Sequence, residues 1–348
     1  MNKRYTIKEV SEIFNITKNK IRFYEKKGLI NPERDKFNNY RYFKEKDLIK
    51  LQTILMYRVL DLSIHDIKDI FNDNRKDNEL DHFYNQWEVI NSRMQKMKLI
   101  RDALKELMDI IYISDSKEYK GKMVDIIKDM NEIYKLKEDW KDKWDFDTWS
   151  KTYDETVKND PSSLKIYENY EKILNNTFKT ATKDKTKDIK ILDIGVGTGN
   201  LSKLFLERGY DILGLDQSRE MLNVAKNKFP NLKLRPGDFL KIPFENNSFD
   251  IIVSTYAFHH LNNEEKKVAI KEMINVLNKN GRIVIGDLMF EDDKEKEKIM
   301  KSLSKEEIYE IEDEYYSNIK FLEREFKSYG KKLEKVRIDK FNFIIEVN

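Results

Sequence analysis

Residues 189–216 of this 348-residue chain read IKILDIGVGTGNLSKLFLERGYDILGLD, and they decide the fold of its second half. The apolar run 189–194 predicts a buried strand that ends in a glycine-rich turn, and residues 201–208 predict the following helix. A second predicted strand over 211–216 ends in Asp216, about 20 residues beyond the glycines. In a strand–helix–strand unit, an acid at this spacing reaches the two ribose hydroxyls of a nucleoside.

The alternation of strand and helix continues toward residue 348. Further strands are predicted at 232–234, 249–254 and 281–287, a helix at 262–278, and a terminal hairpin at 333–338 and 341–347. Such alternation is typical of an α/β doubly wound, Rossmann-like sheet. We therefore predict a multidomain chain whose C-terminal domain, residues 146–348, has this fold.

The spacing of the glycines separates two kinds of nucleotide-binding fold. Dinucleotide sites favour G-x-G-x-x-G, whereas this chain has G-x-G-x-G over 195–199. With Asp216, GDF at 237–239 and SFDIIV at 248–253, this turn resembles class I S-adenosylmethionine-dependent methyltransferases. The segment DTWSKTYD at 147–154 also resembles the opening helix of the branch that methylates small molecules.

This resemblance implies S-adenosyl-L-methionine as the cofactor. The implied cofactor-binding residues are Asp193, Gly195, Gly197 and Gly199 at the methionine part, Asp216 and Gln217 at the ribose, Asp238 and Phe239 at the adenine, and Ser254 beside the reacting methyl group. Tyr153 is expected to face the positively charged sulfonium, which suits an aromatic ring. The alternative is that Tyr153 belongs to the core.

The segment STYAFHHL at 254–261 bears on the methyl acceptor. It lacks the Asn/Asp-Pro-Pro-Tyr motif used on exocyclic amines, and the absence of cysteine disfavours C5-pyrimidine and thiol-based chemistry. A small-molecule acceptor is therefore expected. His259 and His260, with Tyr153, are the candidate catalytic residues, because an imidazole can take a proton from an acceptor O–H or N–H. Alternatively, one histidine only caps the next helix.

The first 60 residues carry a separate signal. They hold 15 Lys and Arg against 7 Asp and Glu, a net charge of +8, whereas the whole chain has +3. A basic head on a mildly acidic body indicates a polyanionic partner for the head. Thr6 and Thr17 predict the N-caps of two short helices in a helix-turn-helix pattern. The β-prone run 40–43 predicts a wing, and further helices are expected over 46–60 and 64–71.

The head contains IRFYEKKGLI at 21–30 and NYRYF at 39–43, which resemble the MerR family of transcription regulators. The resemblance implies a winged helix-turn-helix domain over residues 1–75 that binds double-stranded promoter DNA. The implied DNA-binding residues are Thr17, Lys20, Arg22 and Tyr24 in the recognition helix, and Tyr40 and Arg41 in the wing. Tyr24 is alternatively a core residue.

Residues 76–145 predict a helical connector. Apolar residues recur there in steps of three and four that only Arg101 interrupts, namely Leu80, Phe83, Trp87, Ile90, Met94, Met97, Leu104, Met108 and Ile111. This period predicts a coiled coil, and the MerR resemblance implies a homodimer formed through it. The alternative is an amphipathic helix packed on its own chain. Because there is no cysteine and only four histidines are present, we expect no metal site.

The sequence therefore predicts a cytoplasmic DNA-binding regulator fused to a methyltransferase domain. No apolar run is long enough to span a bilayer, so no membrane partner is expected. The sequence leaves open whether the domain methylates a small molecule and couples occupancy to promoter binding, or only senses a ligand without turnover. A nucleic-acid methyltransferase is a third hypothesis, which the acidic C-terminal part disfavours.

Overall fold

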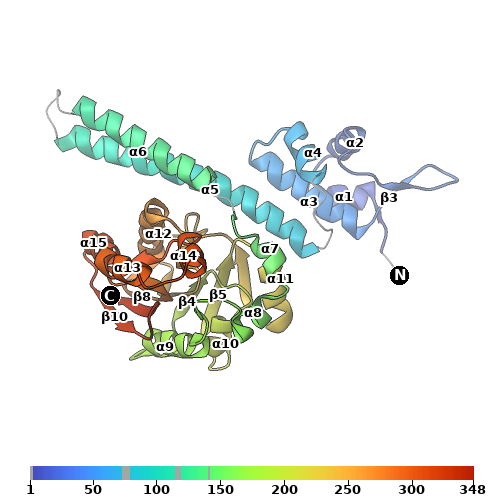
Figure 1. Ribbon diagram of the computed structural model, residues 1–348. Coiled ribbons are helices and arrows are strands. Elements are labelled where there is room, and N and C mark those ends of the chain that lie inside the picture. The colour runs from blue at the N-terminus through green and yellow to red at the C-terminus, as the bar shows by residue number, and fades with distance from the viewer. Residues whose placement is uncertain (1–2, 73–78, 114–118, 140–141) are drawn as a thin grey trace. The chain divides into compact units, whose positions relative to one another are not determined.

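The computed structural model describes residues 3–72, 79–113, 119–139 and 142–348 (Figure 1). The chain divides into two compact units, Met1–Gln86 and Trp87–Asn348. The sequence instead suggested boundaries near residues 75 and 145. Most of the connector belongs to the second unit, because its helices form hydrogen bonds and ion pairs with the C-terminal sheet domain.

The N-terminal unit combines short helices with a small antiparallel sheet. The helices are α1 (Ile7–Ile13), α2 (Lys18–Lys26), α3 (Glu45–Val59) and α4 (Ile64–Asn72), and the strands β1 (Tyr5–Thr6), β2 (Glu33–Arg34) and β3 (Arg41–Phe43) pair in the order β1-β3-β2. The Thr6 and Thr17 hydroxyls accept the backbone N–H of Glu9 and Lys20, so both predicted N-caps are confirmed. The wing is also confirmed, whereas β1 is too short to leave a sequence signal.

Helices α5 (Glu79–Ile113) and α6 (Tyr119–Asp139) form the connector, and Figure 1 shows them side by side. The predicted heptad positions do not all have the same surroundings. Trp87 donates its indole N–H to the Pro236 carbonyl at 3.0 Å. The side chains that are 53–69% exposed are those of Met94, Met97, Leu104, Met108 and Ile111; that of Leu80 lies outside the described residues. The helix is confirmed, and the coiled coil stays a prediction.

The C-terminal domain is built on a mixed, mostly parallel sheet. Its main strands are β4 (Lys190–Ile194), β5 (Asp211–Asp216), β6 (Lys233–Pro236), β7 (Phe249–Thr255), β8 (Leu277–Phe290), β10 (Leu333–Arg337) and β11 (Asn342–Val347), in the order β10-β11-β8-β7-β4-β5-β6, and β9 (Ser317–Asn318) pairs with β8. Strands β4 to β8 pair in parallel, whereas β10 and β11 form an antiparallel hairpin at one edge. The predicted doubly wound sheet and terminal hairpin are thus confirmed.

Helices cover both faces of this sheet (Figure 1). They are α7 (Phe146–Trp149), α8 (Tyr153–Asn159), α9 (Tyr170–Thr182), α10 (Asn200–Leu206), α11 (Arg219–Lys228), α12 (Asn263–Val276), α13 (Asp293–Met300), α14 (Lys305–Glu312) and α15 (Ile319–Ser328), with a 3₁₀ turn at Phe258–His260. Branched aliphatic and aromatic residues fill the core between sheet and helices. Within the described part of the chain, no helix has the length and apolar character needed to cross a bilayer.

The strand order reverses beside β4, and this fixes where a ligand can bind. The chain runs from β4 outward through β5 to β6, and then returns to place β7 on the other side of β4. The loops after β4 and β7 therefore diverge and leave a crevice at the carboxyl ends of the strands. In doubly wound sheets ligands bind at such a switch point.

Candidate active site

A cavity lies at this switch point, with about 810 Å³ of space between protein atoms, part of it open to solvent. It is lined by Phe146, Trp149, Tyr153, Tyr170, Ile194, Gly195, Val196, Gly197, Thr198, Asn200, Leu201, Asp216, Gln217, Met221, Gly237, Asp238, Phe239, Thr255, Tyr256, Ala257, His260 and Leu261. The structure thus brings the glycine turn together with Asp216, Asp238 and His260 around one cavity.

The glycine turn leaves room for a ligand against its backbone. Gly195 and Gly197 have φ of +71° and +51°, in the left-handed region that favours glycine. A Cβ on Gly195 would lie 2.4 Å from the Cβ of Ala257, whereas one on Gly197 would meet no atom within 4 Å. The backbone of Gly197 therefore borders open space.

Asp216, at the end of β5, is hydrogen-bonded to the glycine turn. Its two carboxylate oxygens accept the backbone N–H of Gly197 at 2.8 Å and of Ser218 at 2.9 Å. Burial raises the pKa of Asp216 to about 6, although these two hydrogen bonds oppose the shift. Each carboxylate oxygen has further acceptor capacity, so a ligand hydroxyl can still donate to this group.

Asp238 and Phe239 form the next part of the wall, in the loop after β6. One oxygen of Asp238 accepts the backbone N–H of Leu240 at 2.7 Å and of Lys241 at 3.0 Å. Burial raises the pKa of Asp238. The Phe239 ring packs edge-to-face on Phe258 with centroids 5.4 Å apart. This loop can therefore present a fixed acceptor beside an aromatic ring.

Helices α7 and α8 place aromatic rings over the cavity. Trp149 and Tyr153 meet edge-to-face with centroids 5.0 Å apart. Burial raises the pKa of Tyr153 well above its ordinary value, and nearby tyrosines add to the shift. Tyr153 is therefore a neutral phenol. Its place in the cavity lining favours contact with a ligand over a purely internal core position.

Two carboxylates hold these helices in place, and the motif at 147–154 contains both. Asp147 accepts the Ser218 hydroxyl at 2.6 Å, which joins α7 to the start of α11. Asp154 accepts the Thr198 hydroxyl at 2.6 Å and the Asn200 amide at 2.9 Å, which joins α8 to the glycine turn. The motif alone did not predict a role for either acid.

The two histidines differ in position. His260 lines the cavity, and its Nδ1 lies 2.8 Å from a Glu314 oxygen. His259 lies behind it, with Nδ1 2.5 Å from Asp287. Burial alone would lower the pKa of His259, but the Asp287 and Glu314 carboxylates outweigh it and the pKa lies above its ordinary value. No local sequence pattern marks Asp287 or Glu314 as partners of these histidines.

Four predicted residues are not among those that line the cavity: Asp193, Gly199, Ser254 and His259. Asp193 is buried and accepts the Ser202 hydroxyl at 2.7 Å. Ser254 is fully buried, and its successor Thr255 lines the cavity instead, because successive strand residues face opposite sides. Gly199 lies at the start of α10, where a Cβ would crowd the Phe229 ring at 2.9 Å.

The predicted DNA-binding residues differ in their exposure to solvent. Lys20 and Arg22 lie on the exposed part of α2, and Tyr40 in the wing is 67% exposed. Thr17 is the cap of α2. Tyr24 is only 2% exposed, which favours the alternative of a core residue, and its contact with DNA stays a prediction. Arg41 is half-buried, and its Nε lies 2.7 Å from Glu25.

Comparisons with known proteins match both parts of the chain. A family profile described as "MerR HTH family regulatory protein" matches residues 5–74, and one described as "Methyltransferase domain" matches residues 191–281. An uncharacterized methyltransferase of Alkaliphilus oremlandii is 37% identical over 205 residues, which cover 58% of this chain and 94% of that protein. One from Oceanobacillus iheyensis is 36% identical, with 58% and 93% covered.

Solved methyltransferase structures also align with the chain. Magnesium protoporphyrin IX methyltransferase from Synechocystis PCC 6803, with bound SAH, aligns with a TM-score of 0.46 and 13% identity. The alignment covers 59% of this chain and 99% of that one.

The glycine turn yields a matched pair of substitutions. Gly195→Ala combines a left-handed backbone with a clash against Ala257, so we expect a loss of about 2–5 kcal/mol in stability. Gly197→Ala has the same backbone cost but open space, so about 1–2 kcal/mol is expected. Scanning calorimetry of both variants measures the difference. Equal losses would show that the close approach to Ala257 does not constrain the turn.

Proposed function

Because this chain belongs to the S-adenosylmethionine-dependent methyltransferases and carries an N-terminal MerR-type helix-turn-helix domain, we propose that it is a DNA-binding transcription regulator that methylates a small molecule. The observation that carries the catalytic part is the cavity itself. It joins the glycine turn, the buried Asp216, the half-buried Asp238 and several aromatic rings at the switch point of the sheet.

The cavity residues fit the cofactor. Asp216 can accept the ribose hydroxyls, and Asp238 can accept the adenine amino group beside the Phe239 ring. Gly197 borders space in which the methionine part can lie against the backbone. When bound, S-adenosylmethionine supplies an electrophilic methyl group with a good leaving group. Tyr153 then offers an aromatic face to the sulfonium charge.

The chain's own contribution to transfer is positioning and exclusion of water. Phe146, Trp149 and Tyr153 line the cavity and would lie beside a bound acceptor. These aromatic rings suit a small molecule that enters the cavity. The mild acidity of residues beyond the basic head also disfavours a nucleic-acid acceptor.

We place the promoter-binding surface on the exposed face of α2 and on the wing. Lys20, Arg22 and Tyr40 present cationic and aromatic side chains of the types that contact phosphates and bases. Arg41 is aligned by Glu25, and the hydrogen bonds from Arg41 and Arg34 overcome the effect of burial and keep the pKa of Glu25 low. This ionised partner holds the wing against α2.

The connector offers a route from cofactor occupancy to DNA binding. Trp87 donates to the carbonyl of Pro236, which immediately precedes the cavity residues Gly237 and Asp238. Gln95 donates to the Ile242 carbonyl at 3.1 Å, six residues further along the same loop. Helix α5 therefore holds the loop that would bind adenine.

A second set of contacts joins α5 to the ribose side. The Arg219 guanidinium donates through Nε to Glu88 at 3.1 Å, and Arg219 lies three residues after Asp216. A change in either loop on cofactor binding would thus act on α5, which begins at Glu79 within the DNA-binding unit. Such coupling is reciprocal: DNA must shift cofactor affinity by the factor by which cofactor shifts DNA affinity.

We also propose a homodimer through the exposed apolar face of α5. Met97, Leu104 and Met108 recur along one helix and are more than half exposed in the single chain. Burial of such a row against a second copy is favourable by about 25 cal/mol per Å² of apolar surface. Two helix-turn-helix heads would then match two half-sites on DNA.

The cofactor assignment predicts a pH-dependent affinity. Because the pKa of Asp216 is about 6 and protonation removes its negative charge and part of its acceptor capacity, the Kd for S-adenosylhomocysteine should rise as pH falls through 6. The rise is at most about tenfold per pH unit. Calorimetry between pH 5 and 8 measures it, and a labelled-methyl assay then tests acceptors.

Two asparagine variants show whether Asp216 or the buried Asp193 causes the pH dependence. Asp216→Asn should bind weakly with little pH dependence. Asp193→Asn is the control: burial raises the pKa of Asp193 to about 7, but it does not line the cavity, so the wild-type slope should remain. No binding by the wild type at any pH would refute the cofactor site.

Two substitutions on the surface of α5, one in the apolar row and one beside it, test the dimer. Leu104→Lys places a charge in the exposed apolar row and should leave a species of 41.9 kDa, whereas the wild type should have twice this mass. Glu106→Lys, on an exposed position of the same helix, should stay dimeric. Light scattering after gel filtration measures both. A dimeric Leu104→Lys protein would place the interface elsewhere.

The coupling is tested on the cofactor side of α5. Trp87→Leu removes the hydrogen bond to Pro236, so the ratio of DNA Kd values with and without S-adenosylhomocysteine should move toward one. Tyr112→Leu is the control, because this aromatic side chain of α5 is 82% exposed. Fluorescence anisotropy measures the ratio. A ratio unchanged by Trp87→Leu, but different from one, would exclude this route.

A further inference from the structure

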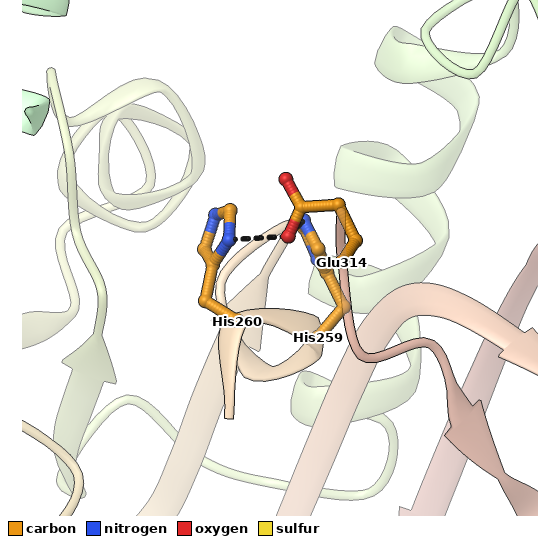
Figure 2. A group of neighbouring side chains, drawn as sticks. All are labelled: His259, His260 and Glu314. Carbon is orange, nitrogen blue, oxygen red and sulfur yellow. Dashed lines mark hydrogen bonds and ion pairs between the residues drawn. The ribbon is translucent and has the colours of Figure 1, made fainter. Parts of the chain in front are cut away.

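We propose that His259, His260 and Glu314 form a binding site for a divalent transition-metal ion at the wall of the cavity. Sequence reasoning expected no metal site, because only the fold brings Glu314 to the two histidines. Figure 2 shows the Glu314 carboxylate lying beside both imidazole rings. One nitrogen of each ring and one Glu314 oxygen lie within 4.8 Å of one another.

The distances between these atoms suit one ion. The Glu314 oxygen lies 2.8 Å from Nδ1 of His260 and 3.9 Å from Nε2 of His259. Two ligands at the usual Zn²⁺ distance of about 2.1 Å, in tetrahedral arrangement, lie about 3.4 Å apart. The first of these distances is shorter than that spacing and the second is about 0.5 Å longer, while all three atoms lie within 4.8 Å of one another. Side-chain movements of up to about an ångström would enclose an ion, which would replace the proton that His260 Nδ1 shares with Glu314.

Asp287 prepares His259 for this role. It accepts the Nδ1–H of His259, which leaves the lone pair on Nε2, the atom that faces Glu314. Metal-binding histidines commonly donate their other N–H to a carboxylate in this way. Asp287 also accepts the backbone N–H of Phe258 at 2.7 Å and of His259 at 3.1 Å, so it fixes the whole turn.

The surrounding residues also hold the three side chains in place. Trp144 and Phe146 pack on His260 with ring centroids 4.5 and 4.9 Å away. The backbone N–H of Tyr315, next to Glu314, donates to the His259 carbonyl at 3.0 Å and holds the acid near the turn. The histidine side chains are 3% and 9% exposed, whereas that of Glu314 is 20% exposed. Glu314 thus leaves a path for an ion.

The ligand set indicates the kind of ion and its use. Two imidazoles and one carboxylate favour Zn²⁺ or a similar first-row ion over Mg²⁺ or Ca²⁺. Three protein ligands leave a coordination position open. Because His260 also lines the cavity, that position suits an oxygen atom of the methyl acceptor. This last step rests on the proposed function, and it narrows the acceptor to molecules with a metal-binding oxygen.

The test is Zn²⁺ binding to full-length protein that has been freed of metal with a chelator. Titration against a chromophoric competitor should show one tight equivalent per chain. Glu314→Gln keeps the side-chain size and should lower the affinity at least about 100-fold, and Asp287→Asn should lower it about 10- to 100-fold. His65→Gln removes a histidine from an exposed pair with Asp69 and should change nothing.

Two further measurements keep the test decisive. Co²⁺ added to the wild type should give visible bands of a four- or five-coordinate nitrogen and oxygen site, a readout that needs no variant. S-adenosylhomocysteine affinity is measured in each variant as a check that the cavity is intact. Equal Zn²⁺ affinity in Glu314→Gln and wild type, or six-coordinate Co²⁺ spectra, would overturn the metal site. Zn²⁺ binding without S-adenosylhomocysteine binding would uphold it and refute the proposed function alone.

Discussion

The buried carboxylate of Asp216 is the group on which the cavity depends. Its oxygens accept the N–H groups of Gly197 and Ser218, so one side chain fixes both the turn after β4 and the start of α11. Ser218 in turn donates to Asp147, which holds α7 over the cavity. An ionised carboxyl is costly to bury unless hydrogen bonds compensate it. Ligand hydroxyls would complete that compensation, so the group that shapes the cavity also favours ligand binding there.

Features with a local period or a local turn could be predicted from the sequence. The parallel strands, the caps at Thr6 and Thr17 and the glycine turn each depend on residues close together in the chain. Pairings between distant residues could not. Asp287 lies on β8 and Glu314 between α14 and β9, and only the sheet brings them to the histidine turn. Thr255 lines the cavity in place of the predicted Ser254 for a related reason. Side chains alternate between the two faces of a strand, so an error of one residue in position selects the side chain on the wrong face.

Helix α5 shows why periodicity alone left two hypotheses open for the connector. Trp87 and Gln95 meet the sheet domain, and the buried Lys137 on α6 is paired with Glu272 at 2.9 Å. The exposed row that includes Met97 and Leu104 lies on the same helix. The helix therefore packs on its own chain, as one hypothesis expects, and its exposed apolar face leaves the coiled coil a prediction. Directional hydrogen bonds hold one face of α5 against the sheet domain, and the exposed apolar face remains available for burial against a partner.

The histidine turn owes its geometry to strain that its neighbours hold in place. Tyr256, directly after β7, has a φ of +50°, which is costly for a residue with a large side chain. Its ring packs against Tyr167 and Tyr170 with centroids 5.2 and 5.3 Å away, and its backbone N–H donates to Gly286 at 3.1 Å. These contacts bend the chain sharply at the end of the strand. His260 then lines the cavity and His259 contacts Asp287, while both rings keep one nitrogen toward Glu314.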